Sequence, residues 1–112
     1  MQLLILVLNK TEKLNDLLLA LGNNGISGGT ILDSTGMARM LYDSNIGIPF
    51  FSAINMMMSD GRPMNKTVFM VLDDDKVDTA KDTIKTVCNF NEPGVGVMFT
   101  LPVSSFEGSK KL

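Results

Sequence analysis

Side chains that commonly carry out catalysis or bind metals are scarce in this chain. It contains no histidine and a single cysteine, Cys88, so imidazole acid–base catalysis is excluded and a transition metal lacks its usual ligands. Adjacent carboxylates occur at Asp73-Asp74-Asp75; they either hold a metal or start a helix as solvated residues, and the helix start is favoured. Cys88 is expected to pack as a small apolar residue, with a reactive thiol as the less favoured alternative. We therefore expect no enzyme and no metal site.

One glycine-rich segment offers a different kind of chemistry. Gly28-Gly29 precedes the short strand that begins at Thr30, whereas Gly94-Val95-Gly96 is read from the residues only as the entry to the last strand. Glycines before a strand let backbone N–H groups approach an anionic ligand. A tight turn that packs closely against a helix explains Gly28-Gly29 as well, and spacing alone favours that simpler interpretation.

The charge of the chain argues against nucleic acid as a partner. Ten basic and twelve acidic residues give a net charge of −2, and the basic residues are scattered, whereas a nucleic-acid footprint needs a basic stripe.

Residues 1–8 lack the basic region and cleavage site of a signal peptide, and no apolar run is long enough to insert directly into a membrane. One cysteine fits a reducing compartment. We expect a cytoplasmic protein with one domain, residues 1–112.

Three apolar runs, at residues 3–8, 68–72 and 97–103, are the strongest signals for the elements that position these segments. Side chains alternate across a strand, so Leu3, Ile5 and Val7 face one way and Leu4, Leu6 and Leu8 face the other. Both faces of the first strand are therefore apolar and need covering. A chain of 112 residues has enough helix for one face, so the other face needs a partner.

Helices are predicted at residues 11–22 and after Asp73-Asp74-Asp75. Thr11 is a suitable N-cap for the first helix, and Leu14, Leu17, Leu18 and Leu21 follow at helical spacing. The second helix has an apolar stripe made of Val77, Ala80, Ile84, Val87 and Cys88.

The full order of elements predicts an α+β fold. Further strands are expected at residues 30–32 and about 66–72, which gives strand, helix, strand, long loop, strand, helix, strand. This is the ferredoxin-like βαββαβ pattern, a four-stranded antiparallel sheet in the order 4-1-3-2 with two helices on one face.

Residues 34–63 form the long loop of this pattern. They exceed the usual connection length, which is typical of a functional or mobile loop. Pro49 suits the first turn of a short helix at about 50–58. Its adaptable, methionine-rich face suits docking on a partner protein, although packing on the chain's own sheet or on a neighbouring subunit is favoured. That face consists of Phe50, Phe51, Ile54, Met57 and Met58.

Two stretches resemble the PII-type nitrogen-regulatory signalling proteins. Residues 25–31, followed by Gly36-Met37-Ala38-Arg39, are similar to the segment that enters the long T-loop of that family, and residues 94–103 are similar to its B-loop and last strand. The element order agrees over essentially the whole chain. The resemblance implies a homotrimer with the bare sheet faces around its threefold axis. It also implies a nucleotide or other small anionic effector in each cleft between subunits, and a T-loop that docks on a regulated enzyme or transporter.

Two groups of residues are expected to have roles, the first from the resemblance and the second from the apolar face of the loop together with the docking role that the resemblance implies. The ligand-binding group is Gly28, Gly29, Thr30, Gly36, Met37, Ala38, Arg39, Gly94, Val95 and Gly96. The partner-binding loop group is Tyr42, Phe50, Phe51, Ile54, Met57 and Met58.

The chain also departs from the family pattern. Val97 stands where the family has a lysine that meets nucleotide phosphates, Met40 and Ala38 replace a glutamine and a glycine, and Tyr42 is not in the context of the family's modified tyrosine. The short tail lacks the family's arginine pair, for which Lys110 or Lys111 could substitute. We therefore expect a divergent PII-like member that binds ATP weakly or not at all, because a buried triphosphate needs paired cations.

Three functions remain open on the sequence. The first is a regulatory trimer that controls a partner, in nitrogen regulation or in response to another signal. The second is an assembly protein with an empty cleft. The third is an enzyme or a metal-handling protein on the same fold, such as the similarly folded divalent-cation-tolerance family. The missing histidine and the unpaired cysteine count against it.

Overall fold

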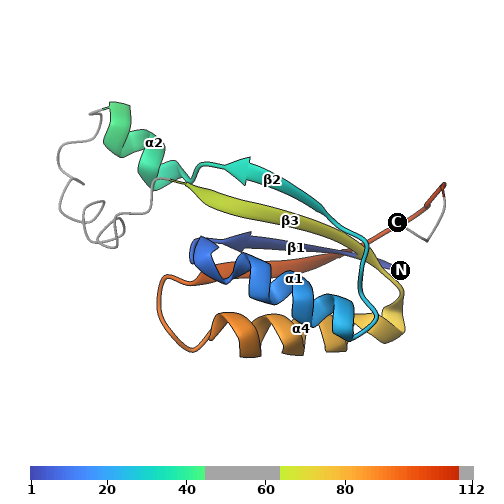
Figure 1. Ribbon diagram of the computed structural model, residues 1–112. Helices are drawn as coiled ribbons and strands as arrows, with labels where there is room; N and C mark the ends of the chain where they lie inside the picture. The colour runs from blue at the N-terminus through green and yellow to red at the C-terminus, as the bar shows by residue number, and fades with distance from the viewer. Residues whose placement is uncertain (45–63, 109–112) are drawn as a thin grey trace.

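The computed structural model of the chain describes residues 1–44 and 64–108 (Figure 1). This part of the chain has an α+β arrangement built on one four-stranded antiparallel sheet in the order β2-β3-β1-β4. The strands are β1 (Gln2–Leu8), β2 (Thr30–Ser34), β3 (Asn65–Leu72) and β4 (Gly96–Pro102). The predicted order 4-1-3-2 is the same order read from the other edge, so it is confirmed. The arrangement is compatible with the ferredoxin-like fold.

The first strand, β1, lies in the middle of the sheet. Its residues are apolar on both faces, so both faces are suitable for packing. Leu4, Leu6 and Leu8 are 0% exposed and form the centre of the core. Ile5 pairs with Phe69 of β3 and with Phe99 of β4 on the opposite face. One face of β1 is therefore fully covered, while the other carries large apolar side chains that are only partly covered.

Two helices lie on the same face of the sheet (Figure 1). α1 (Leu14–Asn23) buries Leu17 and Leu21, and α4 (Asp74–Cys88) buries the predicted stripe positions Val77, Ala80, Ile84 and Cys88. The buried leucines of β1 and the buried positions of the two helices therefore form one core.

The start of the first helix differs from the prediction. Thr11 is not an N-cap but the first residue of a 3₁₀ turn, η1 (Thr11–Lys13). Its N–H donates to the carbonyl of Asn9 at 2.9 Å, and the N–H of Lys13 donates to the carbonyl of Lys10 at 3.0 Å. The chain therefore begins to coil before Thr11, and α1 starts without a side-chain cap. The prediction for Asp73 holds for its position, since Asp73 is the extended N-cap residue of α4, but its side chain makes no capping hydrogen bond.

The long loop begins with a helix that was not predicted, α2 (Met37–Ser44). Its first turn is closed by the N–H of Met40, which donates to the carbonyl of Gly36 at 3.1 Å. Figure 1 shows α2 beyond the end of β2 and β3, away from the two core helices. The backbone of Tyr42 belongs to α2, whereas the predicted helix at about 50–58, with Phe50, Phe51, Ile54, Met57 and Met58, lies outside the described residues.

No helix that the structure describes covers the second face of the sheet, which we call the open face. Val97 is 58% exposed, Phe99 48% and Leu101 46%. The strand registers place apolar residues from neighbouring strands beside one another on this face. These residues are Leu3, Ile5, Val7, Leu32, Phe69, Val71, Val97, Phe99 and Leu101. In the part of the chain that the structure describes, the open face is therefore an apolar surface with no helix over it, as the sequence indicated.

Candidate functional site

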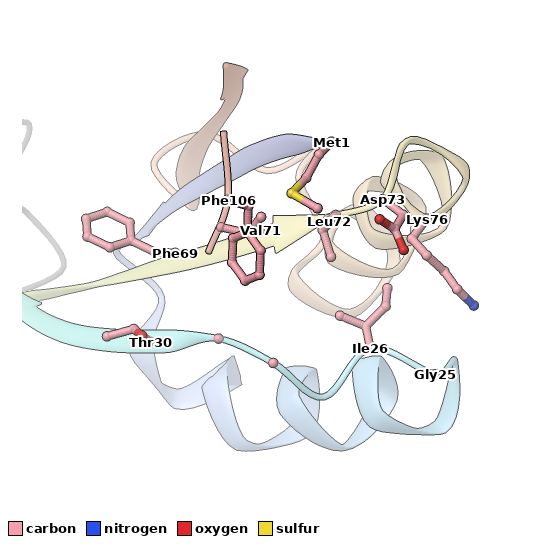
Figure 2. Close-up of a pocket in the computed structure, with 12 residues that line it drawn as sticks. Met1, Gly25, Ile26, Thr30, Phe69, Val71, Leu72, Asp73, Lys76 and Phe106 are labelled. Atoms are coloured by element: carbon pink, nitrogen blue, oxygen red, sulfur yellow. The ribbon is translucent and has the colours of Figure 1, made fainter. Parts of the chain in front are cut away.

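A cavity of about 260 Å³ opens where the chain enters β2. Gly28, Gly29 and Thr30, three of the predicted ligand-binding residues, line it. Phe69 and Val71 reach it from β3, and Phe106 reaches it from the segment that follows β4 (Figure 2). The cavity thus joins the predicted glycine segment to an apolar wall at one end of the sheet.

Close packing explains part of the glycine content around this cavity. A Cβ on Gly29 would lie 3.3 Å from Cγ of Met70 and 3.4 Å from the carbonyl oxygen of Phe69. Gly25 has a φ of +79°, and a Cβ there would lie 3.3 Å from Nζ of Lys76. A side chain at Gly25 would therefore be strained and would crowd Lys76, a cation of the cavity lining. The sequence analysis did not include Lys76, since its place behind three aspartates indicates only the first turn of a helix.

The predicted residues at the start of the long loop lie at the other end of β2. Gly36 precedes α2, and Met37, Ala38 and Arg39 form its first turn. The side chain of Met37 is 79% exposed, whereas Ala38 and Arg39 are half-buried. A Cβ on Gly36 would lie 3.7 Å from the side-chain nitrogen of Asn65, which places the loop start against the first residue of β3.

The third predicted segment, Gly94-Val95-Gly96, lies next to the end of β1. Val95 is 3% exposed and belongs to the core, so only its backbone is suited to face a ligand. Its carbonyl accepts hydrogen bonds from the N–H of Asn9 at 2.8 Å and of Lys10 at 3.2 Å. A Cβ on Gly96 would lie 2.4 Å from the carbonyl oxygen of Val7, so this position has no room for a side chain.

These three segments do not meet within one chain. Thr30 pairs with Phe69, whereas Ser34, two residues before Gly36, pairs with Asn65 at the opposite end of β2. Gly96 pairs with Leu8 at that same end, but on the other edge strand. With neighbouring strands about 4.8 Å apart, β2 and β4 are separated by roughly 14 Å. The three segments therefore do not line one compact site within a single chain.

A row of polar side chains connects two of these segments across the end of the sheet. Ser34 donates to the side-chain oxygen of Asn65 and lies 2.7 Å from the hydroxyl of Thr67. The side-chain amide of Asn65 donates to that of Asn9 at 3.2 Å, and Asn9 donates to the carbonyl of Gly94 at 3.4 Å. We call these four side chains, of Thr67, Ser34, Asn65 and Asn9, the polar row. The sequence analysis missed it, because polar residues at strand ends are usually solvated.

Several ionisable groups of the described residues form ion pairs at the surface. Lys10 forms an ion pair with Glu92, and the hydrogen bond and positive charge of Lys10 lower the pKa of Glu92. Lys66 pairs with Asp33 across β3 and β2. Burial raises the pKa of the Cys88 thiol, against a smaller opposing effect of Lys13, which agrees with a residue packed in the core. Among residues 1–44 and 64–108, no three acidic or cysteine side chains are grouped so that they could hold a metal ion.

Comparison with models of known protein families gives no match, and comparison with curated proteins finds no relative. Within the part of the chain that the structure describes, no helix has both the length and the apolar character needed to cross a membrane.

Proposed function

We propose that this chain is a PII-like regulatory protein that binds a small anionic effector in clefts between subunits and controls a partner protein through its long loop. The observation that carries the proposal is the position of the cavity. Gly28, Gly29 and Thr30 line it, and the same backbone continues through β2 into α2 and the long loop. A ligand in contact with the start of β2 therefore acts on the strand that leads into the loop.

Two further features support the assembly that this function needs. The open face has nine apolar side chains in adjacent strands, and such a surface usually marks a protein interface. The three predicted ligand-binding segments lie apart within one chain, so a cleft between neighbouring subunits is the arrangement that brings them together. We propose a homotrimer, as the resemblance to the PII family implies.

A ligand screen tests the regulatory function. Thermal unfolding would be measured with adenine nucleotides, 2-oxoglutarate, bicarbonate and cyclic nucleotides. A ligand that binds only the folded protein adds about 2.7 kcal/mol of stability at a hundredfold excess over its dissociation constant, so one of these compounds should raise the melting temperature clearly. ATP should raise it least among the nucleotides, because exposed Val97 supplies no cation.

Arg39 gives the screen a residue-level control. Arg39→Ala should weaken the effector found by about 1.5–3 kcal/mol if the guanidinium meets its charged group. Lys85→Ala removes a positive charge from the last turn of α4 and should leave affinity unchanged. Equal affinity of the Arg39→Ala variant in calorimetry would remove Arg39 from the site.

The open face also favours a second candidate function, a purely structural assembly protein. In that case no compound in the screen would change the melting temperature, although the protein would still associate.

A further inference from the structure

We infer that the polar row is a directional relay that couples the start of the long loop to the Gly94-Val95-Gly96 segment, with Asn9 and Asn65 as its positioning residues. The functional meaning of this relay rests on the proposed function, because it joins two of the segments assigned to the effector site. Its existence can be tested without any effector.

The direction of the relay follows from its donors and acceptors. A serine hydroxyl has one proton. That of Ser34 points at Asn65, whose side-chain oxygen is the nearer acceptor and whose main-chain carbonyl lies farther away, at 3.4 Å. The 2.7 Å contact between Ser34 and Thr67 must then be donated by Thr67. Next, the Asn65 amide nitrogen donates to the Asn9 oxygen, and the Asn9 nitrogen donates to the Gly94 carbonyl. Every hydrogen bond in the row therefore points the same way, toward Gly94.

Hydrogen bonds that point the same way polarise one another, so a change at one end of the row alters the strength of the other links. One end is Ser34, the last residue of β2, two residues before Gly36. The other end is the Gly94 carbonyl. The next carbonyl along the chain, that of Val95, accepts hydrogen bonds from the backbone N–H groups of Asn9 and Lys10. An effector that changes the environment of Gly94 would thus be sensed at the start of the long loop.

The two asparagines are chemically specific for this task, since a side-chain amide carries a donor and an acceptor on one rigid group. The relay uses both functions at each asparagine. In Asn65→Asp the side chain keeps its shape and its acceptor for Ser34, but it loses the N–H that points at Asn9. Asn9 can then pair with the carboxylate only by turning its own N–H away from Gly94.

The hydrogen bond between Asn9 and the Gly94 carbonyl is the link at which a change in the relay is easiest to detect. The contact between Asn9 and the Gly94 carbonyl is 3.4 Å long, near the upper limit for a hydrogen bond and therefore weak. The carbon resonance of the Gly94 carbonyl reports whether that hydrogen bond is present.

We would measure the Gly94 carbonyl resonance by NMR in the full chain and in Ser34→Ala, Asn65→Asp and Thr30→Ala variants. Thr30 is the matched control, because it lies on the same strand and the same face as Ser34 but at the cavity end. Each change would be repeated in an Asn9→Ala background, where the relay is cut before Gly94. All of these side chains are at least partly exposed, so the variants should fold.

The relay predicts that Asn65→Asp shifts the Gly94 resonance most, that Ser34→Ala shifts it by less, and that Thr30→Ala leaves it in place. In the Asn9→Ala background neither of the first two changes should shift it further. The experiment includes no effector, so a failed ligand screen leaves this result intact, and a failed relay leaves the proposed function standing. A Ser34→Ala shift no larger than that of Thr30→Ala, or one that persists without the Asn9 side chain, would overturn the relay.

Discussion

Gly96 is the residue at which the backbone leaves least room. A Cβ there would lie 2.4 Å from the carbonyl oxygen of Val7 and 3.2 Å from the Cα of Leu8. Both neighbours are main-chain atoms of the central strand, so they cannot turn aside as a flexible side chain would. The lack of a side chain at Gly96 is therefore a requirement of the sheet.

Gly96→Ala should accordingly destabilise the fold by about 1–3 kcal/mol, the usual cost of forcing extra atoms into a packed site. Urea unfolding followed by circular dichroism would measure the loss. Gly22→Ala is the control, because nothing lies within 4 Å of a Cβ at that helical position, and alanine there should be neutral or stabilise by up to about 1 kcal/mol. Equal stability of the two variants would contradict the close approach of β4 to β1.

The sequence predicted single residues well where they follow a simple period. Leu4, Leu6 and Leu8 had to share one face because side chains alternate along a strand, and all three are fully buried. The polar row could not be predicted in this way. Asn9 and Asn65 are 56 positions apart, and their contact depends on the register between β1 and β3, which no local pattern specifies.

Helix α1 shows how an element is held in place by one of its faces. Leu17 is 0% exposed and lies in the core, whereas Leu19, two positions along the same helix, is 68% exposed. The apolar spacing was right for Leu17 and Leu21, which are buried, and Leu14 packs partly against the core. It was wrong for Leu18, which is 37% exposed, because the face that α1 turns to the sheet is narrower than the predicted stripe. Helix α2 was missed, since its eight residues are too few for a periodic apolar pattern to stand out from a loop.

Leu17→Ala should lower the free energy of unfolding by about 2–5 kcal/mol, because it leaves a cavity between the helix and the sheet. Leu19→Ala is the matched control on the same helix and should change stability by no more than about 0.5 kcal/mol. Chemical denaturation of both variants would make the comparison. A loss at Leu19 as large as that at Leu17 would show that the buried face of α1 is assigned wrongly.

At the scale of the whole molecule, the open face is the feature that most needs an explanation. Its apolar residues come from all four strands, and Phe99, halfway along the edge strand β4, is 48% exposed. Within residues 1–44 and 64–108, helices cover only one side of a sheet that is apolar on both sides, so the core of this part is open on the other side. The proposed trimer completes that core with the open faces of two further copies.

Sedimentation equilibrium at micromolar concentration should therefore give a mass near three chains. Phe99→Asp places a charge in the proposed interface, where desolvation costs several kcal/mol, so it should weaken association by at least about tenfold, equivalent to about 1.4 kcal/mol. Leu19→Asp, on the outer side of α1, should keep the wild-type mass. A well-folded monomer, or a Phe99→Asp variant that associates as tightly as the wild type, would contradict the proposed assembly.

The rate at which reagents modify the buried thiol of Cys88 can report how often the core opens. Thiol reagents attack the thiolate, and Cys88 is 0% exposed with its pKa raised by burial, so labelling has to wait until α4 separates from the sheet. When opening and closing are fast, the labelling rate follows the population of the open form. Because the sequence has one cysteine, the modified fraction reports that single event without an added probe. Labelling rates that fall as the protein concentration rises would reveal how far neighbouring copies keep the core closed.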